Sequence, residues 1–228
     1  MKEITPNISR YLVFSLTLFA VSACSTSRTD LTSNDPLPVY DGESVVIMAR
    51  SYHTGNQTEK NFTKCVIDAL DSGRNGINIM PGEQFVDAMY PWFEPRTAPN
   101  NISGLPKLMN NELVATRMRE TGVRYVVWLD GNTDRPNGGG SLSCAAGPGG
   151  AGCFGFAWWE SKSDYDAVVW DLEDGKEAGN IATKVSGTSY MPAIVIPIPM
   201  IARTKATACK DLSVQLKDFI AGAQTAGD

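Results

Sequence analysis

The chain contains a single histidine, which limits the acid–base catalysis it can offer, because a triad of serine, histidine and an acid needs an imidazole. That residue, His53, lies in the sequence Ser-Tyr-His-Thr-Gly after an apolar run, where a loop is expected. The glycine-rich segment around Ser141 and Ser143 lacks the strand, turn and helix pattern that exposes a serine nucleophile. The sequence therefore indicates a non-catalytic protein without a cofactor, with a hydrolase that uses His53 as the alternative.

Cysteines offer a second chemistry. Four of the five, Cys65, Cys144, Cys153 and Cys209, lie in the main body of the chain and permit two disulfides in three connectivities. No metal site is expected, because the chain has no C-x-x-C pair and one histidine. Only Ala, Gly and Pro separate Cys144 from Cys153, so a bridge there would constrain a loose loop. Cys65 and Cys209 lie on the apolar stripes of two expected helices, which makes them natural partners.

Aromatic residues are the stronger functional lead. Trp158 and Trp159 are adjacent on an expected strand, so their side chains point to opposite faces of the sheet. If helices cover both faces, these rings belong to the core. The alternative is an exposed aromatic patch near the Cys144–Cys153 loop that docks a partner protein or a glycan. The candidate partner-binding residues are Trp158, Trp159, Phe154, Phe156 and Trp92.

Strands and helices are expected to alternate in the first half of the domain. Residues 44–49 form a continuous apolar run, typical of a strand buried on both faces. A helix follows, with Thr58 as its N-cap and Gly73 as its stop. Its apolar stripe has helical spacing and consists of Phe62, Cys65, Val66, Ala69 and Leu70.

Further strands are expected at residues 77–80 and 124–129. A short helix around residues 83–90 and another capped by Asn110 or Asn111 lie between them. The resulting β-α-β-α-β order implies parallel strands joined by right-handed crossovers.

The second half of the chain predicts antiparallel strands. Residues 131–152 are rich in Gly and Pro and are expected to form a loop. Residues 153–160 and 165–172 are strand-like, and residues 173–176 form a hairpin turn into a further strand. Residues 194–199 are apolar but contain prolines, so they form at most an edge strand or an extended packing segment.

The final expected element is an amphipathic helix, whose stripe consists of Cys209, Leu212, Leu216, Phe219 and Ile220. The fold class is therefore α/β (α+β). It comprises a mixed β-sheet with a β-α-β-α-β start, an antiparallel hairpin extension and a C-terminal amphipathic helix packed on the sheet.

The N-terminus resembles a bacterial lipoprotein signal. Val21-Ser22-Ala23-Cys24 follows an apolar run at residues 11–20 and resembles a lipobox. The resemblance implies cleavage before Cys24 and acylation of its thiol and new amine. With Ser25 next, it also implies transport to the outer membrane of a Gram-negative envelope, lipid-anchored and facing the periplasm. The alternative is an ordinary secretory signal with Cys24 incidental, and both interpretations export the chain.

These assignments divide the chain into four parts. Residues 1–23 are the signal peptide, and residues 24–42 are the lipidated cysteine and a flexible tether. Residues 43–222 form a single α/β domain, and residues 223–228 a disordered tail. A formal net charge of −5 does not favour binding to nucleic acid.

The domain also resembles a known envelope family. The strand at residues 122–128 and the later strand that ends at residues 167–175 resemble a shared α/β domain. That domain occurs in CsgG-like curli-secretion lipoproteins, the N-terminal domain of the TolB translocation protein, and lipoprotein activators of penicillin-binding proteins. The pore-forming hairpins of the channel subunits are not recognised, so secretion-channel activity is not implied.

The resemblance, over about residues 43–220, implies a membrane-anchored, non-catalytic binding or assembly module. Its partner would be another envelope protein or its own copies. The alternatives are an envelope hydrolase that uses His53 and a purely structural envelope lipoprotein.

Overall fold

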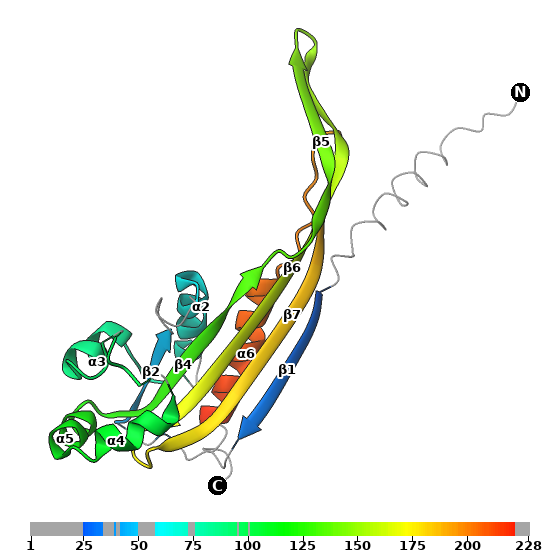
Figure 1. Ribbon diagram of the computed structural model, residues 1–228. Coiled ribbons are helices and arrows are strands. Elements are labelled where there is room, and N and C mark those ends of the chain that lie inside the picture. Colours follow the sequence, from blue (N-terminus) through cyan, green and yellow to red (C-terminus); the bar gives the residue numbers. More distant parts are fainter. Residues whose placement is uncertain are drawn as a thin grey trace, which may run out of the picture.

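A computed structural model of the protein describes residues 25–33, 39, 42–49, 58–72, 76–94, 96–99 and 101–221. The described residues form a seven-stranded mixed sheet with the order β1-β7-β6-β4-β2-β3, and β5 pairs with β6 off this path. Figure 1 shows helices on both faces of the sheet and a long ribbon that projects beyond it. The expected fold class, mixed α/β with a C-terminal helix on the sheet, is confirmed.

The parallel part of the sheet comes from the first half of the chain. Strand β2 (Ser44–Ala49) pairs in parallel with β3 (Ile79–Met80) and with β4 (Val123–Asp134). Helix α2 (Lys60–Asp71) connects β2 to β3. A short 3-10 helix, Ile102–Gly104, and three α-helices lie between β3 and β4, namely α3 (Gly82–Ala88), α4 (Leu105–Met109) and α5 (Glu112–Glu120). The expected β-α-β-α-β start is confirmed.

The antiparallel part consists of much longer strands than the sequence predicts. Residues 153–160 and 165–172 belong to one continuous strand, β6 (Gly150–Asp171), which pairs with β7 (Lys176–Val195). The expected turn between them is confirmed. The expected loop at residues 131–152 is wrong: it contains the end of β4 and strand β5 (Gly138–Gly147). The reason is backbone pairing with β6, which depends little on side chains.

Helices fill two hydrophobic cores on opposite faces of the sheet. On one face, α2 and α6 (Thr204–Ala221) cover the sheet, and all five expected stripe residues of α6 are buried there. On the other face, α3, α4 and α5 enclose a second core around Phe85, Trp128 and Trp170. Part of this second face is open along β6 and β7, where Lys162, Asp164 and Lys184 are exposed.

The expected tether does not hold for its first residues. Ser25–Ser33 form strand β1, which pairs antiparallel with β7 along its whole length. The segment has no apolar pattern, and its order comes from the backbone ladder and from Ser27, which hydrogen-bonds Asp211 of α6. Sequence reasoning missed this strand because an edge strand can be polar on both faces.

Helix starts were predicted with mixed success. Asn111 caps α5, because its side-chain oxygen accepts a hydrogen bond from the amide of Leu113 at 3.1 Å. Thr58 does not cap α2, which begins one residue later than expected. The hydroxyl of Thr58 instead donates a hydrogen bond to the carbonyl of Leu129 at 3.2 Å and so connects the start of the helix to β4.

Candidate functional site: an uncharged arm with an aromatic face

The projecting ribbon consists of β5, the first ten residues of β6 (150–159) and the last seven of β7 (189–195), and we call it the arm (Figure 1). Its register has no shift in β6 between residues 150 and 169, so the alternation of faces continues from the body into the arm. Phe154, Phe156 and Trp158 therefore share one face, and Trp159 lies on the other.

A disulfide holds the arm near its end. Cys144 and Cys153 are direct cross-strand partners, with Cα atoms 4.0 Å apart, so the expected bridge is confirmed. Gly155 is required in this ribbon: its φ is +142°, and a Cβ there would lie 2.2 Å from the carbonyl oxygen of Ser141. Strands β5 and β6 therefore approach each other closely at Gly155, and the disulfide joins them covalently.

One face of the arm is aromatic. The ring of Phe156 lies 6.1 Å from that of Tyr190, and Phe154 is paired across the strands with Ile194. The side chain of Phe154 is 74% exposed and that of Phe156 is 47% exposed, although both are large and apolar. Trp158 is half-buried, and its indole lies over Gly139. We define the aromatic face of the arm as Phe154, Phe156, Trp158, Tyr190 and Ile194.

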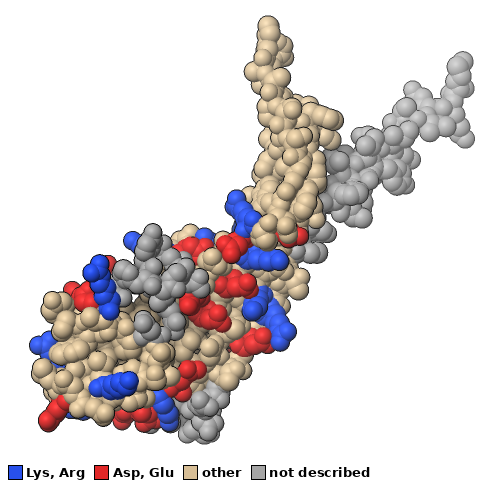
Figure 2. Space-filling model, viewed as in Figure 1, with Lys and Arg blue, Asp and Glu red and all other residues tan. Residues whose placement is uncertain are grey.

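The arm carries no charged side chain. Residues 136–159 and 185–202 contain neither Asp, Glu, Lys nor Arg. Figure 2 shows the acidic and basic residues confined to the body of the molecule and the projecting part without them. Exposed aromatic and aliphatic groups on an uncharged surface are typical of an interaction site.

The remaining predicted partner-binding residues are not on this face. Trp159 is half-buried on the opposite face of the arm. Trp92 lies in the body, packed against the second hydrophobic core, with the guanidinium of Arg117 6.0 Å from its ring centroid. The predicted set of five thus divides into three residues that share one face of the arm and two that lie elsewhere. Tyr190 and Ile194 were missed because only the register brings them beside Phe154 and Phe156.

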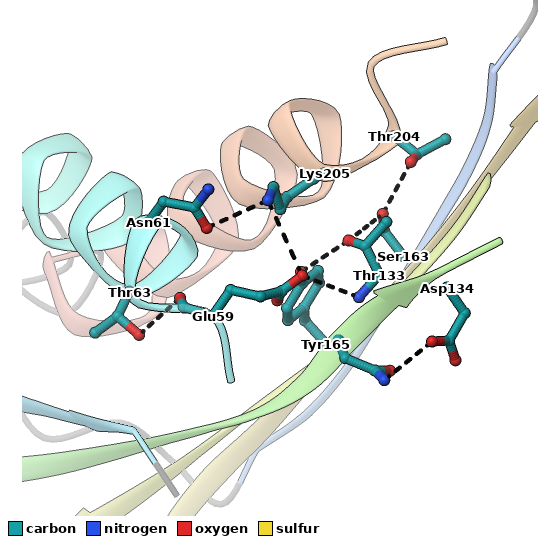
Figure 3. A network of polar contacts seen from close by, with 10 residues as sticks. Glu59, Asn61, Thr63, Thr133, Asp134, Ser163, Tyr165, Thr204 and Lys205 are labelled. Atoms are coloured by element: carbon teal, nitrogen blue, oxygen red, sulfur yellow. Dashed lines mark hydrogen bonds and ion pairs between the residues drawn. The ribbon is translucent and has the colours of Figure 1, made fainter. Parts of the chain in front are cut away.

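A polar network joins the starts of α2 and α6 to the sheet (Figure 3). The carboxylate of Glu59 accepts hydrogen bonds from the hydroxyl of Tyr165 at 2.5 Å and from the amide of Thr133 at 3.2 Å. Lys205 lies 4.0 Å from Glu59, and Ser163 donates to Thr204 at 2.9 Å. Burial, together with the bond to Glu59, raises the pKa of Tyr165 well above its ordinary value.

The contacts of this network connect two helices to the sheet and are typical of a structural role. The Tyr165 ring stacks on Phe62 with centroids 3.5 Å apart, and its hydroxyl has partners in both Glu59 and Thr133. A neutral phenol held by a carboxylate is a poor acid or nucleophile at neutral pH. Within the described residues there is also no group of three His, Cys, Asp or Glu that could bind a metal ion.

A second charged cluster lies beside a cavity of about 400 Å³ that is lined by Arg119, Arg124 and Glu43 among others. Arg124 is buried, and its guanidinium donates to the buried Asp171 at 2.8 Å and pairs with Glu173. The carboxylate of Asp171 also accepts hydrogen bonds from the backbone amides of Glu173 and Asp174 and so stabilises the β6–β7 turn. The carboxylates of Asp171, Glu173 and Glu43 already neutralise Arg124, so this guanidinium is engaged within the protein.

The remaining site predictions have different outcomes. Cys65 of α2 and Cys209 of α6 are bridged, with Cα atoms 6.3 Å apart, which confirms the predicted pairing. Cys24 and His53 lie outside the described residues. Among the described helices, none combines the length and the apolar character needed to cross a membrane.

Comparisons with known proteins give little beyond the structure itself. No family model and no curated protein matches the chain. The similar solved structures include a PelC dodecamer and a dodecamer of a PelC variant, both from Paraburkholderia phytofirmans. They are 14% and 13% identical, with TM-scores of 0.38, and each match covers 86% of this chain and 99% of the other. A TM-score this low transfers neither assembly nor function to this protein.

Proposed function

We propose that this protein is an exported lipoprotein of the bacterial cell envelope that works by binding and not by catalysis. Cys24 carries the lipid anchor, the outer membrane holds it, and the α/β domain faces the periplasm. The protein is a binding or assembly module, and the aromatic face of the arm is the surface that contacts an envelope protein.

The observation that carries this proposal is the exposure of the aromatic face. Phe154 and Phe156 form an apolar surface on a disulfide-bonded ribbon, beside Tyr190 and Trp158. Aromatic residues supply much of the binding energy in protein interfaces, and rigid ribbons lose little entropy on binding. Two disulfides support export to an oxidising compartment, because cytosolic proteins rarely keep them.

Support for a non-catalytic role comes from the polar residues of the body. Glu59 and the terminal nitrogens of Arg124 bond to internal partners and connect helices and turns, although the buried Nε of Arg124 has no hydrogen-bond partner. The alternatives are an envelope hydrolase that uses His53 and a purely structural lipoprotein. A loss of the envelope phenotype in His53→Ala, with unchanged abundance, would favour the hydrolase.

The proposed relation to CsgG-like, TolB-like and penicillin-binding-protein-activator lipoproteins rests on the order of strands and helices. The partner is then another envelope protein or a second copy of the chain. Sedimentation of the purified protein distinguishes these two partners. A second copy gives an oligomer of the purified protein alone, whereas another envelope protein gives a larger species only when envelope extract is added.

A paired substitution tests the binding surface. Phe154→Asp with Phe156→Asp places two charges on the aromatic face, whereas Leu113→Asp places one on an exposed apolar residue of α5. Cross-linking in the envelope should give a defined adduct with the parent and with Leu113→Asp, and the adduct should be lost in the double variant. Both substituted positions in the arm are solvent-exposed, so folding should be unaffected. An unchanged adduct in the double variant contradicts the proposed surface.

A further inference from the structure

The segment that begins with the last two residues of β7 in the arm is apolar throughout and leaves most of its side chains in solvent. Residues 194–201, Ile-Val-Ile-Pro-Ile-Pro-Met-Ile, run from the end of β7 back along the arm toward α6, and we call them the return segment (Figure 1). Ile196 is 71% exposed and Ile198 is 62% exposed, and Val195 and Ile201 are exposed as well. With Ile194, five exposed aliphatic residues lie within these eight positions, which is an unusual density for a surface in water.

The backbone of the return segment has few amides left to hydrate. Pro197 and Pro199 have no amide hydrogen. Ile198 donates to the carbonyl of Pro192 at 2.9 Å, and Met200 donates to that of Tyr190 at 2.8 Å. Four of the five residues 196–200 therefore either lack an amide hydrogen or have it bonded to β7.

The number of backbone amides without a partner differs between the two edges of the arm. A backbone amide that leaves water for hydrocarbon without a partner is strongly unfavourable. Strand β5 pairs with β6 alone among the described strands, so its outer edge needs water or another strand. The return segment covers the outer edge of β7, where bridges join Ala193 to Pro197 and Tyr190 to Met200. Of the two edges of the arm, this one therefore leaves fewer backbone amides without a partner.

Charged residues of both signs mark the base of the arm, where Lys184 is the cross-strand partner of Asp164 and Lys162 lies on the same face. The uncharged run of residues 185–202 is bounded by Lys184 and Arg203, both of which are exposed. Cations at such a boundary can contact anionic head groups.

The start of the described chain lies at the same end of the body. Ser25 pairs with Gly187, which in turn pairs with Ser161 at the base of the arm. Residue 24 therefore precedes a strand that begins beside the arm and runs away from it. A lipid anchor at Cys24 and a lipid contact in the return segment would act on the same side of the molecule.

We propose that the return segment binds the surface of a phospholipid bilayer. Ile196 and Ile198 enter the outer part of the hydrocarbon, Lys184 and Arg203 contact the head groups, and the outer edge of β5 stays in water. The arm therefore docks on one leaflet and does not cross it. The segment contains none of the Trp, Tyr and Arg residues that dominate protein interfaces, which favours lipid over a protein partner.

A tryptophan reporter tests this contact in the full protein. Ile198→Trp places the reporter in the return segment, and Leu113→Trp places a matched one on α5, where the parent residue is also exposed and apolar. The exported proteins are reconstituted with vesicles of phosphatidylethanolamine and phosphatidylglycerol, with or without bromine on the acyl chains. The emission of the parent protein under the same conditions is subtracted.

The reporter at residue 198 should shift to shorter wavelength with vesicles and lose emission when the acyl chains carry bromine, and the reporter at residue 113 should do neither. Emission at residue 198 that stays typical of water overturns the proposal. A blue shift without quenching by bromine also overturns it, because another protein then covers the segment. Palmitate labelling of the same samples reports separately on Cys24, so failure of the proposed anchor is distinguished from failure of the lipid contact.

Discussion

At the scale of single residues, Glu59 and Tyr165 form the most consequential polar contact. Their hydrogen bond joins residues 106 positions apart and places the start of α2 over β6. Tyr165 is buried and packed on Phe62, so without Glu59 its hydroxyl would keep Thr133 as its hydrogen-bond partner. Such buried bonds contribute modestly when made and cost more when one partner is left alone.

Replacing Tyr165 with Phe should lower the free energy of unfolding by about 1–3 kcal/mol, because Glu59 loses a buried donor. Tyr90→Phe, at an exposed tyrosine, is the control and should have little effect. Urea unfolding at neutral pH measures both. A change in Tyr165→Phe no larger than in Tyr90→Phe would show that the bond contributes nothing.

The same residue predicts a pH dependence. Burial first, and the bond to Glu59 second, raise the pKa of Tyr165 above its ordinary value of about 10. The contribution to stability is fully present below that ordinary value and is lost as pH rises toward the folded-state pKa. Above about pH 10 the parent should therefore lose stability more steeply than Tyr165→Phe. Parallel slopes in urea unfolding across this range would contradict the raised pKa.

At the scale of elements, the two disulfides stabilise different parts of the molecule. The Cys65–Cys209 bridge spans 144 residues and joins the two helices on one face of the sheet. The Cys144–Cys153 bridge spans 9 residues and lies wholly within the arm. In the chain-entropy model the longer loop restricts the unfolded chain more, so the first bridge has the larger effect on global stability.

Replacing Cys65 and Cys209 with Ser should lower the free energy of unfolding by about 5 kcal/mol, the value that the chain-entropy model gives for a loop of this length. Replacing Cys144 and Cys153 with Ser should mainly speed hydrogen exchange in β5 and the arm part of β6, because the arm contacts the body only at its base. Denaturant unfolding and amide exchange, each applied to both double variants, measure the two effects. Equal global destabilisation would show that the arm folds as one unit with the body.

At the scale of the whole molecule, charge is divided between a mixed-charge body and an uncharged arm (Figure 2). The open face of β6 and β7 in the body carries Lys162, Asp164 and Lys184, and the polarity of this surface ends at the base of the arm. Strand β1 begins at the same place. Both the proposed anchor and the proposed contacts thus lie toward one end of the protein, and the body extends away from them.

Replacing Cys24 with Ala tests the anchor at this scale. Palmitate labelling should be lost, and the protein should either appear in the soluble periplasmic fraction or keep its signal peptide, because one residue carries both acylation sites. Ser22→Ala, two residues earlier, keeps the acylated residue and is the control. Palmitate labelling that persists in Cys24→Ala would contradict the lipoprotein interpretation.

The sequence by itself determined the features that depend on local side-chain patterns. The stripes of α2 and α6, the Asn111 cap, the β6–β7 turn and both disulfide pairings follow from periodicity and from the chemistry of short motifs. Cys65 and Cys209 could be paired in advance because each lies on the buried stripe of its helix, and helices on one sheet face become neighbours.

Only the tertiary structure decided the features that depend on backbone pairing. The polar strand β1 and the glycine-rich β5 are ordered by the ladders of β7 and β6, which depend little on side-chain pattern. The aromatic face exists because a continuous register places Tyr190 and Ile194 beside Phe154 and Phe156, while Trp92 packs in the body. Register between distant strands is a property of the folded sheet, so no local motif encodes it.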